Sequence, residues 1–488
     1  MSRSHRFSTP VLILCALGLL PTALMDAWGA QPEPEILGSC WISQVAKVVG
    51  SNTDAYDELG FSVAVSGDTA VVGAWKAEGA VPLSGAAYVL RRNHGGSGAW
   101  GEVAVLAASD GDVYDLFGGA VAIDGDTIVV GASSADGATT DTGAVYVFER
   151  NADGADAWGQ VVKLIAADGA NLDSFGSSVA VKGDTIVVGA RNHTAAADRS
   201  GAAYIFRRNQ GGVGAWGQLV KLTASDASSD NAFGHSVAIA GDTVVVGANQ
   251  DRSAYVFERN AGGADTWGEV GILGGTGVVH HSFGVSIAIE GDTLVVGGNT
   301  TLEPGAAWVF ERNHGGVDAW GEVQRLTASD GSVEDFFGAT VAISGGAVMV
   351  GASRSDAASP DAGAASLFER NAGGADAWGQ VGTLAPTDSS ADFGYSVALA
   401  GGLTLVGARY DIDPGYRSGS AYVFESSCVA MDFGDAADPT CPTLFSSDGA
   451  RHRLVPVQKR RFSTILASTC GFPCAAYEST PPRKPLVS

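Results

Sequence analysis

The sequence predicts an all-β protein: a seven-bladed β-propeller of four-stranded antiparallel blades, whose last blade is closed by the N-terminal strand. Two observations lead to this prediction. A stretch like "FGSSVAVKGDTIVVGA" (175–190) recurs seven times, and each copy belongs to a unit with four short segments rich in Val, Ile, Tyr, Phe and Trp. Residues of these types favour buried, pleated strands. Four-stranded units repeated around a ring make propellers, for which about four to eight blades are usual.

The repeats follow one another at a nearly fixed period. Successive copies are 58, 58, 58, 50, 54 and 56 residues apart when the glycine of the opening pair is used as the marker: Gly60, Gly118, Gly176, Gly234, Gly284, Gly338 and Gly394. A regular period of this size is the signature of a repeat architecture. Seven copies therefore predict seven blades.

The third copy shows how the four strands of one blade are expected to follow one another. The first two strands, 177–181 and 185–190, meet across Gly183-Asp184. A two-residue loop that begins with glycine fits a tight type II′ hairpin. The third strand covers 201–206, and the fourth begins at Trp216 after a loop rich in Asn, Gly and Ala.

The seventh copy stops after its third strand, at Glu425, and the missing strand stands at the other end of the chain. Trp41 opens "WISQVAKVV" and precedes the first repeat as Trp100 precedes the second. We therefore expect the N-terminal strand to complete the last blade and to cover its open edges. Cys40 and Cys428 flank this seam, and a disulfide between them would hold it closed. The alternative is two unrelated free thiols.

The two ends of the chain differ from the repeats. Residues 1–29 combine two arginines, an apolar run and a small-residue cleavage site, as expected of a secretory signal peptide. The propeller is expected over 38–428, and 429–488 form an irregular tail that is either native or truncated. We expect a secreted or cell-envelope protein with no transmembrane segment after signal cleavage. The pairing of Cys441, Cys470 and Cys474 in the tail stays open.

The charge balance bears on the partner. The formal net charge is −24, with only 29 lysines and arginines, which argues against a nucleic-acid partner. In a propeller the loops between strands two and three lie on the same face as the loops between blades, so this face is expected to be strongly acidic and wet. Its interblade loops carry Asp54, Asp57, Asp110, Asp112, Asp115, Asp168, Asp173, Asp226, Asp230, Asp330, Glu334, Asp335, Asp388 and Asp392.

The pattern of Phe-Gly, strand, turn, strand and Gly-Ala resembles the FG-GAP repeat family, whose best-known members form the seven-bladed headpiece of integrin α subunits. Phe175-Gly176 and Gly189-Ala190 carry the two halves of the motif in the third copy. The resemblance covers roughly Cys40 to Cys428 and implies the propeller fold. The proline of the family motif is absent, and the short Gly-Asp turn is similar to the form found in bacterial exported proteins.

Calcium is a possible cofactor, but not at the position where the family binds it. The resemblance implies calcium loops between the first two strands, but one carboxylate on a two-residue turn cannot supply the six to eight oxygens that calcium takes. The remaining metal candidate is "SDGDVYD", where Asp110, Asp112 and Asp115 share one loop. A solvated interblade turn explains the same residues without a metal, and both interpretations stay open.

The residues most suited to binding lie in loops that differ between repeats. Five of them stand out as a ligand face: Trp75, Arg191, Arg409, Asp411 and Asp413. Loops on a rigid scaffold usually carry recognition. The tryptophans that open the fourth strands recur at one position and are expected to be packing anchors rather than a carbohydrate platform.

The sequence thus favours an exported binding or adhesion module, expected to be monomeric, that recognises an extracellular protein or glycan through its acidic loop face. The alternative is a structural repeat scaffold of a larger envelope protein. No catalytic residues are identified, because nucleophilic catalysis needs a base such as histidine beside the nucleophile, and the histidines expected on or near the loop face, among them His193 and His235, show no such arrangement. An enzyme acting on polysaccharide or lipid is a third hypothesis, and a buried histidine or carboxyl pair in a cleft would support it.

Overall fold

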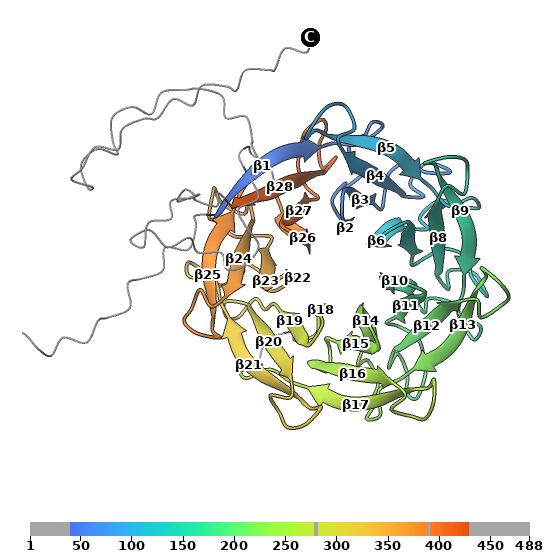
Figure 1. Ribbon diagram of the computed structural model, residues 1–488. Helices are drawn as coiled ribbons and strands as arrows, with labels where there is room; N and C mark the ends of the chain where they lie inside the picture. Colours follow the sequence, from blue (N-terminus) through green and yellow to red (C-terminus); the bar gives the residue numbers. More distant parts are fainter. Residues whose placement is uncertain (1–39, 278–281, 387, 389–390, 429–488) are drawn as a thin grey trace, which may run out of the picture. The chain divides into compact units, whose positions relative to one another are not determined.

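A computed structural model of the protein describes residues 40–277, 282–386, 388 and 391–428. The predicted signal peptide, the C-terminal tail and Cys441, Cys470 and Cys474 lie outside the described residues. Within them, 28 strands form seven four-stranded antiparallel sheets, which stand in a ring as the blades of a propeller (Figure 1). The predicted fold is confirmed. No helix in this part of the chain is long and apolar enough to cross a membrane.

The blades follow the chain in order. Blade 1 consists of β2 (Ser62–Ser66), β3 (Thr69–Ala74), β4 (Ala86–Arg92) and β5 (Trp100–Leu106). Blade 2 consists of β6 (Phe117–Asp124), β7 (Thr127–Ala132), β8 (Ala144–Arg150) and β9 (Trp158–Leu164). Blade 3 consists of β10 (Phe175–Lys182), β11 (Thr185–Ala190), β12 (Ala202–Arg208) and β13 (Trp216–Leu222). Blades 4 and 5 consist of β14 (Phe233–Ala240), β15 (Thr243–Ala248), β16 (Ser253–Arg259) and β17 (Trp267–Leu273); and β18 (Ser286–Glu290), β19 (Thr293–Gly298), β20 (Ala306–Arg312) and β21 (Trp320–Leu326). Blades 6 and 7 consist of β22 (Thr340–Ser344), β23 (Ala347–Ala352), β24 (Ala364–Arg370) and β25 (Trp378–Leu384); and β26 (Phe393–Ala400), β27 (Leu403–Ala408), β28 (Ser420–Cys428) and β1 (Cys40–Val48).

Each blade starts at the centre of the ring and ends at its rim (Figure 1). The first two strands meet in the predicted tight turn, because Lys182 pairs with Thr185 across two residues and Gly183 has φ +55°. In blades 6 and 7 a second glycine follows, and Gly346 and Gly402 also have positive φ, which fits type I′ rather than type II′ turns. The hairpin turns define one face of the ring, here called the turn face. The interblade loops and the loops between strands two and three define the other, here called the loop face.

The ring closes as predicted, with one correction of register. β1 pairs with β28 and completes blade 7. In blade 2, Phe148 pairs with Gln160, two residues after Trp158, and in blade 7 Phe424 pairs with Gln44, two residues after Ile42. Ile42, not Trp41, therefore occupies the tryptophan position, and it packs against the core of blade 7. The spacing in the sequence carried this signal, because Trp41 lies 18 residues before Leu59 whereas Trp100 lies 17 residues before Phe117.

The backbones of Cys40 and Cys428 lie directly opposite each other at the end of this seam. A bridge between two cysteines needs their Cα atoms within roughly 7 Å, which neighbouring strands provide at a facing pair. The disulfide itself stays a prediction.

The two glycines of the motif meet across every seam between blades. A Cβ placed on Gly73 would lie 2.0 Å from the carbonyl oxygen of Gly118 in the next blade, and one on Gly407 would lie 2.1 Å from that of Gly60. Gly118 itself has φ +86°, which L side chains rarely adopt. The motif thus marks the contact that lets wedge-shaped blades pack backbone against backbone.

The repeated tryptophans lie at the outer seams and act as packing anchors. Trp158, Trp216 and Trp378 are buried. The guanidinium carbon of Arg208, from the neighbouring strand, lies 4.6 Å from the ring centroid of Trp216, and Arg208 also pairs with Glu149 of the preceding blade at 2.5 Å. This arrangement joins packing and charge at the seam and confirms the predicted role of the tryptophans.

Candidate ligand-binding face

Backbone hydrogen bonds between neighbouring blades hold the loops of the loop face together. The amide of Tyr56 donates to the carbonyl of Tyr416 at 2.9 Å, and that of Leu172 donates to Asp141 at 3.0 Å. Both donors have positive φ, so bulky side chains stand in a conformation that few non-glycine residues adopt. Such strain persists only where the surrounding structure fixes it. The loops therefore form a preorganised surface.

Several acidic side chains of the loop face are buried and bonded within their own loops. The prediction that the acids of this face are solvated is therefore wrong for them. Asp57, Asp115, Asp173 and Asp335 occupy one position in four interblade loops and are at most 6% exposed. Each accepts a hydrogen bond from the backbone amide three residues earlier, at 2.6 to 2.8 Å. Burial raises the pKa of Asp57 to about 6, against the opposing effect of the Asp54 amide. These carboxylates brace their own loops and offer little to a ligand.

The carboxylates of the candidate calcium loop are also bonded to other groups of the protein. Asp110 accepts hydrogen bonds from the Tyr146 hydroxyl at 2.9 Å and from Lys163 Nζ at 2.6 Å. Asp115 is the buried loop brace just described, and it accepts the amide of Asp112 at 2.8 Å. Within the part of the chain that the structure describes, no three His, Cys, Asp or Glu side chains are grouped to hold a metal ion. The predicted calcium site at Asp110, Asp112 and Asp115 does not fit, because its oxygens already serve a lysine, a tyrosine and the backbone.

Asp411 and Asp413 lie at the closing seam. Asp411 is 2% exposed, and it accepts from the hydroxyls of Ser420 and Tyr422 and pairs with Lys47 Nζ at 2.8 Å. Lys47 also contacts Asp388 at 2.6 Å and Asp413 at 3.4 Å. Although burial alone would lower it, these partners raise the pKa of Lys47. Asp411 is therefore buried in internal contacts and is not a ligand residue. Asp413 is the exposed member of an ion-pair network that joins β1 to the loop after β27.

Trp75 and Arg409 belong to one cluster, which spans the seam between blades 7 and 1. Trp75 stacks on Phe61 with 4.5 Å between centroids, and Phe61 lies 5.2 Å from Tyr395 of blade 7. The guanidinium carbon of Arg409 lies 3.7 Å from the Tyr395 centroid and 4.3 Å from that of Tyr410. The chain of contacts brings together two of the five predicted residues.

The cluster continues outward to side chains that face solvent. Arg417 lies over Tyr410 at 4.2 Å, and Tyr416 meets Tyr56 edge to face at 5.4 Å. Tyr56 and Tyr416 are 54% and 58% exposed. We call the whole group the aromatic cluster; its members are Tyr56, Phe61, Trp75, Tyr395, Arg409, Tyr410, Tyr416 and Arg417.

Arg191 lies elsewhere on the loop face, between blades 3 and 4. It lines a pocket of about 600 Å³ together with Asn192, Arg199, Asp230, Ala232, His235, Asn249 and Gln250. The structure thus divides the five predicted residues among the aromatic cluster, the closing seam and this pocket.

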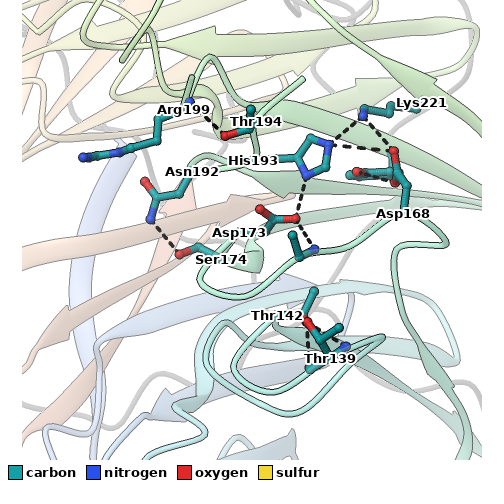
Figure 2. A network of polar contacts seen from close by, with 12 residues as sticks. Thr139, Thr142, Asp168, Asp173, Ser174, Asn192, His193, Thr194, Arg199 and Lys221 are labelled. Carbon is teal, nitrogen blue, oxygen red and sulfur yellow. Dashed lines mark hydrogen bonds and ion pairs between the residues drawn. The ribbon is translucent and has the colours of Figure 1, made fainter. Parts of the chain in front are cut away.

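His193, which the sequence placed on or near the loop face, is buried beneath it. Figure 2 shows His193 between Asp173, 2.6 Å from Nδ1, and Lys221, whose Nζ lies 2.6 Å from Nε2. Lys221 also contacts Asp168 at 2.8 Å. His193 is 4% exposed, and its outer nitrogen faces an ammonium group rather than a hydroxyl or thiol nucleophile. The arrangement braces blade 3.

Phe61, Tyr395 and His235 were not among the residues predicted for the ligand face, although they share one position of the repeat. All three follow the opening glycine of a repeat, where the backbone bulges between paired residues in β14 and β26. The signal was present, because the same position holds residues as different as Gly119, Ser177 and Val285 in other repeats, while the residue before it is always glycine and the residue after it is always small.

Comparison with known proteins gives a family. The FG-GAP repeat family matches residues 42–90, 100–148, 158–206, 216–260, 320–368 and 378–424, which is more than half of the chain. Each matched stretch begins at the position of Ile42 or the repeated tryptophan. Among solved structures, a protein from Lactobacillus plantarum is similar with 13% identity and a TM-score of 0.43, over 66% of this chain and 84% of that chain. No curated protein matches the sequence.

Proposed function

The chain belongs to the FG-GAP repeat family, and from this premise we propose that it is an exported or cell-surface binding module that holds an extracellular protein or glycan through its loop face. The observation that carries the proposal is the aromatic cluster. It places exposed tyrosines and an arginine on strained, hydrogen-bonded loops, supported from below by Phe61, Trp75 and Tyr395. A surface of this kind is built before a partner arrives, so little ordering free energy is lost on binding.

The composition of the cluster favours a protein partner. Tyr, Trp and Arg are the residues most enriched in the hot spots of protein interfaces. Tyr56, Tyr416 and Ile412 expose more than half of their surface on neighbouring loops. Two guanidinium groups in the cluster, Arg409 and Arg417, would favour carboxylates or aromatic side chains in the partner. A glycan is the alternative outcome of the test below.

Binding is proposed rather than catalysis because of how the titratable groups are used. The buried His193 and Asp173 form a pair, but Lys221 occupies the position that a nucleophile would need. Two acids contact the aromatic cluster and both already have partners: Asp392 accepts from Arg409 Nε at 2.8 Å, and Glu58 accepts from Trp75 Nε1 and Lys76 Nζ, each at 2.8 Å. A purely structural scaffold would not need the exposed tyrosines, whose apolar surface is otherwise unfavourable in water.

Export can be tested separately from binding. In an oxidising compartment Cys40 and Cys428, which stand opposite each other at the seam, would form a disulfide. Mass spectrometry of protein isolated from its native host without reductant should show the cross-linked peptides and a chain that lacks 1–29. Free thiols at both positions, or an intact N-terminus, would contradict export.

The binding proposal is tested by site-specific cross-linking. A photoreactive amino acid is placed at Tyr416 on the loop face, and in a control protein at Val317, which is 92% exposed in a loop on the turn face. Both proteins are offered to a defined panel of extracellular proteins and polysaccharides. We expect a cross-link to one protein from position 416 and none from 317. Equal cross-linking from the two faces, or none from either, would refute a role for the loop face.

A further inference from the structure

The pocket between blades 3 and 4 does not depend on the aromatic cluster, and its chemistry is different. Arg191, Asn192 and Arg199 come from the loop after β11, Asp230 from the loop before β14, and Asn249 from the turn directly after β15. Figure 2 shows Asn192 and Arg199 on the same loop as His193. The volume of about 600 Å³ lies within the range of small-ligand sites, roughly 300–1,000 Å³.

The charges of the pocket suit an anion, although the protein as a whole carries a negative net charge. Two guanidinium groups face one carboxylate, since Arg199 Nε lies 3.4 Å from Asp230 Oδ1 and Arg191 has no acid beside it among the lining residues. Burial, and secondarily Arg191, lowers the pKa of His235 to about 4, so its imidazole is neutral at physiological pH. The local excess of positive charge stands on a chain whose net charge is −24. An anionic group small enough to enter would therefore be held by Arg191 and Arg199.

The remaining lining groups of the pocket are suited to a ligand that carries hydroxyl groups. The side-chain oxygen of Asn249 is buried and has no hydrogen-bond partner in the structure. A buried acceptor of this kind costs about 1–3 kcal/mol until a donor reaches it. Asp230, Asn192 and Gln250 add further acceptors and donors, and Ala232 is the one apolar lining residue. A wall this polar gains little from an apolar ligand and much from one that carries several hydroxyl groups.

We propose that this pocket binds an acidic sugar, with the sugar carboxylate held by Arg191 and Arg199 and a ring hydroxyl donating to Asn249 Oδ1. A guanidinium group binds a carboxylate through paired, charge-assisted hydrogen bonds. A hexuronate unit offers the carboxylate and the hydroxyls on one rigid ring. Neutral sugars lack the first group, and simple carboxylates lack the second.

Isothermal titration calorimetry on the purified protein tests the proposal with three probes: galacturonic acid, galactose and glutarate. We expect saturable binding of galacturonic acid in the millimolar range or tighter, and at least about tenfold weaker binding of the other two. Equal binding of galactose would contradict recognition of the carboxylate. Equal binding of glutarate would contradict recognition of the sugar, and no saturable binding of galacturonic acid would overturn the proposal.

Matched variants place the binding in this pocket. Arg191→Gln and Asn249→Leu should each weaken galacturonate binding about tenfold. Arg354→Gln, an exposed arginine on the corresponding loop of blade 6, and Asn299→Leu, at the position of Asn249 in blade 5, should leave it unchanged. Arg191 is exposed, so its substitution is not expected to disturb folding, and the thermal unfolding midpoint of each variant checks this. Loss of binding in the controls, or its retention in both pocket variants, would contradict the assignment.

Discussion

The guanidinium carbon of Arg409 lies 3.7 Å from the ring centroid of Tyr395, while its Nε donates to Asp392 at 2.8 Å. Arg409 follows the Gly-Ala pair of its repeat, and Tyr395 follows the Phe-Gly pair. The same two positions of blade 1 hold Trp75 and Phe61, which stack on each other. Two positions that are free to vary in the repeat thus build the base of the aromatic cluster.

Arg409→Gln should destabilise the protein by about 2 kcal/mol, because Asp392 is 7% exposed and would lose the charge that faces it. Arg409→Lys should restore only part of this, since an ammonium group lacks the planar face that covers Tyr395 and Tyr410. Chemical denaturation measures both. Combining Arg409→Gln with Asp392→Asn should cost less than the sum of the two single changes, and strict additivity would show that the pair is not coupled.

The glycine contact between blades predicts a large difference between two similar substitutions. Gly73→Ala would bring a Cβ within 2.0 Å of the Gly118 carbonyl, so the seam must open, at a cost of about 3 kcal/mol. Gly67→Ala, in the hairpin turn of the same blade, meets nothing within 4 Å and pays only for its positive φ, about 1 kcal/mol. Thermal unfolding of the two variants should rank them in this order. Equal losses would mean that the seam is not as tight as described.

Lys47 should matter more than its counterpart in another blade. Lys47→Met leaves the buried Asp411 without its cation, and the expected loss is about 3 kcal/mol. Lys163→Met, at the corresponding position of blade 2, removes the cation beside Asp110, whose side chain is 50% exposed, and should cost about 1 kcal/mol or less. Urea denaturation curves of both variants compare the two losses. A comparable loss for both would argue against a special role of Lys47 in closing the ring.

The raised pKa of Asp57 predicts a pH-dependent cost. Its carboxyl has a pKa of about 6 in the folded protein and an ordinary value of 3.8, so between these values the folded state binds more protons than the unfolded state. The contribution of Asp57 to the free energy of unfolding therefore falls as pH rises from about 4 to 6. Asp57→Asn keeps an oxygen for the Asp54 amide and removes the buried charge. Its stability relative to the parent should rise across this window, by about 3 kcal/mol at most.

Blade 4 supplies the reverse test of this prediction. Asn231 stands at the position of Asp57, and its amide oxygen can accept the Ser228 amide at 3.2 Å. Asn231→Asp should become less stable than the parent as pH rises. Parallel pH profiles for the parent and both variants would show that burial does not shift these carboxyl groups.

The repeat pattern was sufficient to predict the fold, because every blade has the same strand order and packs against its neighbour in the same way. Hairpin turns, seam glycines and the missing fourth strand of blade 7 all follow from residues that recur. The register of β1 did not follow, since Trp41 looks like the repeated tryptophan while Ile42 fills its position. Residue type favoured Trp41, whereas the spacing to the first repeat fits Ile42, which lies 17 residues before Leu59 as Trp100 does before Phe117.

The candidate site was less accessible to sequence reasoning. Asp57 and Asp115 read as solvated loop acids, yet their loops fold around them. Asp110 could be a calcium ligand or a solvated loop acid on sequence grounds, but Lys163 and Tyr146, both over 30 residues away in sequence, lie against it. Contacts between separate strands decide these roles. The variable positions after each glycine pair were visible in the sequence, and only the ring brought them together.

The most direct measurement of the central claim is the affinity of the protein for a partner identified by cross-linking, determined by biolayer interferometry for two matched double variants. Tyr56→Ala with Tyr416→Ala alters the loop face, and Val213→Ala with Val317→Ala alters two side chains that are 104% and 92% exposed on the turn face. The account predicts that the tyrosine pair weakens binding by a factor of about 30 or more, as for interface hot spots, and that the valine pair changes it less than about twofold. Unchanged affinity in the tyrosine variant, with both proteins folded, would contradict recognition through the loop face.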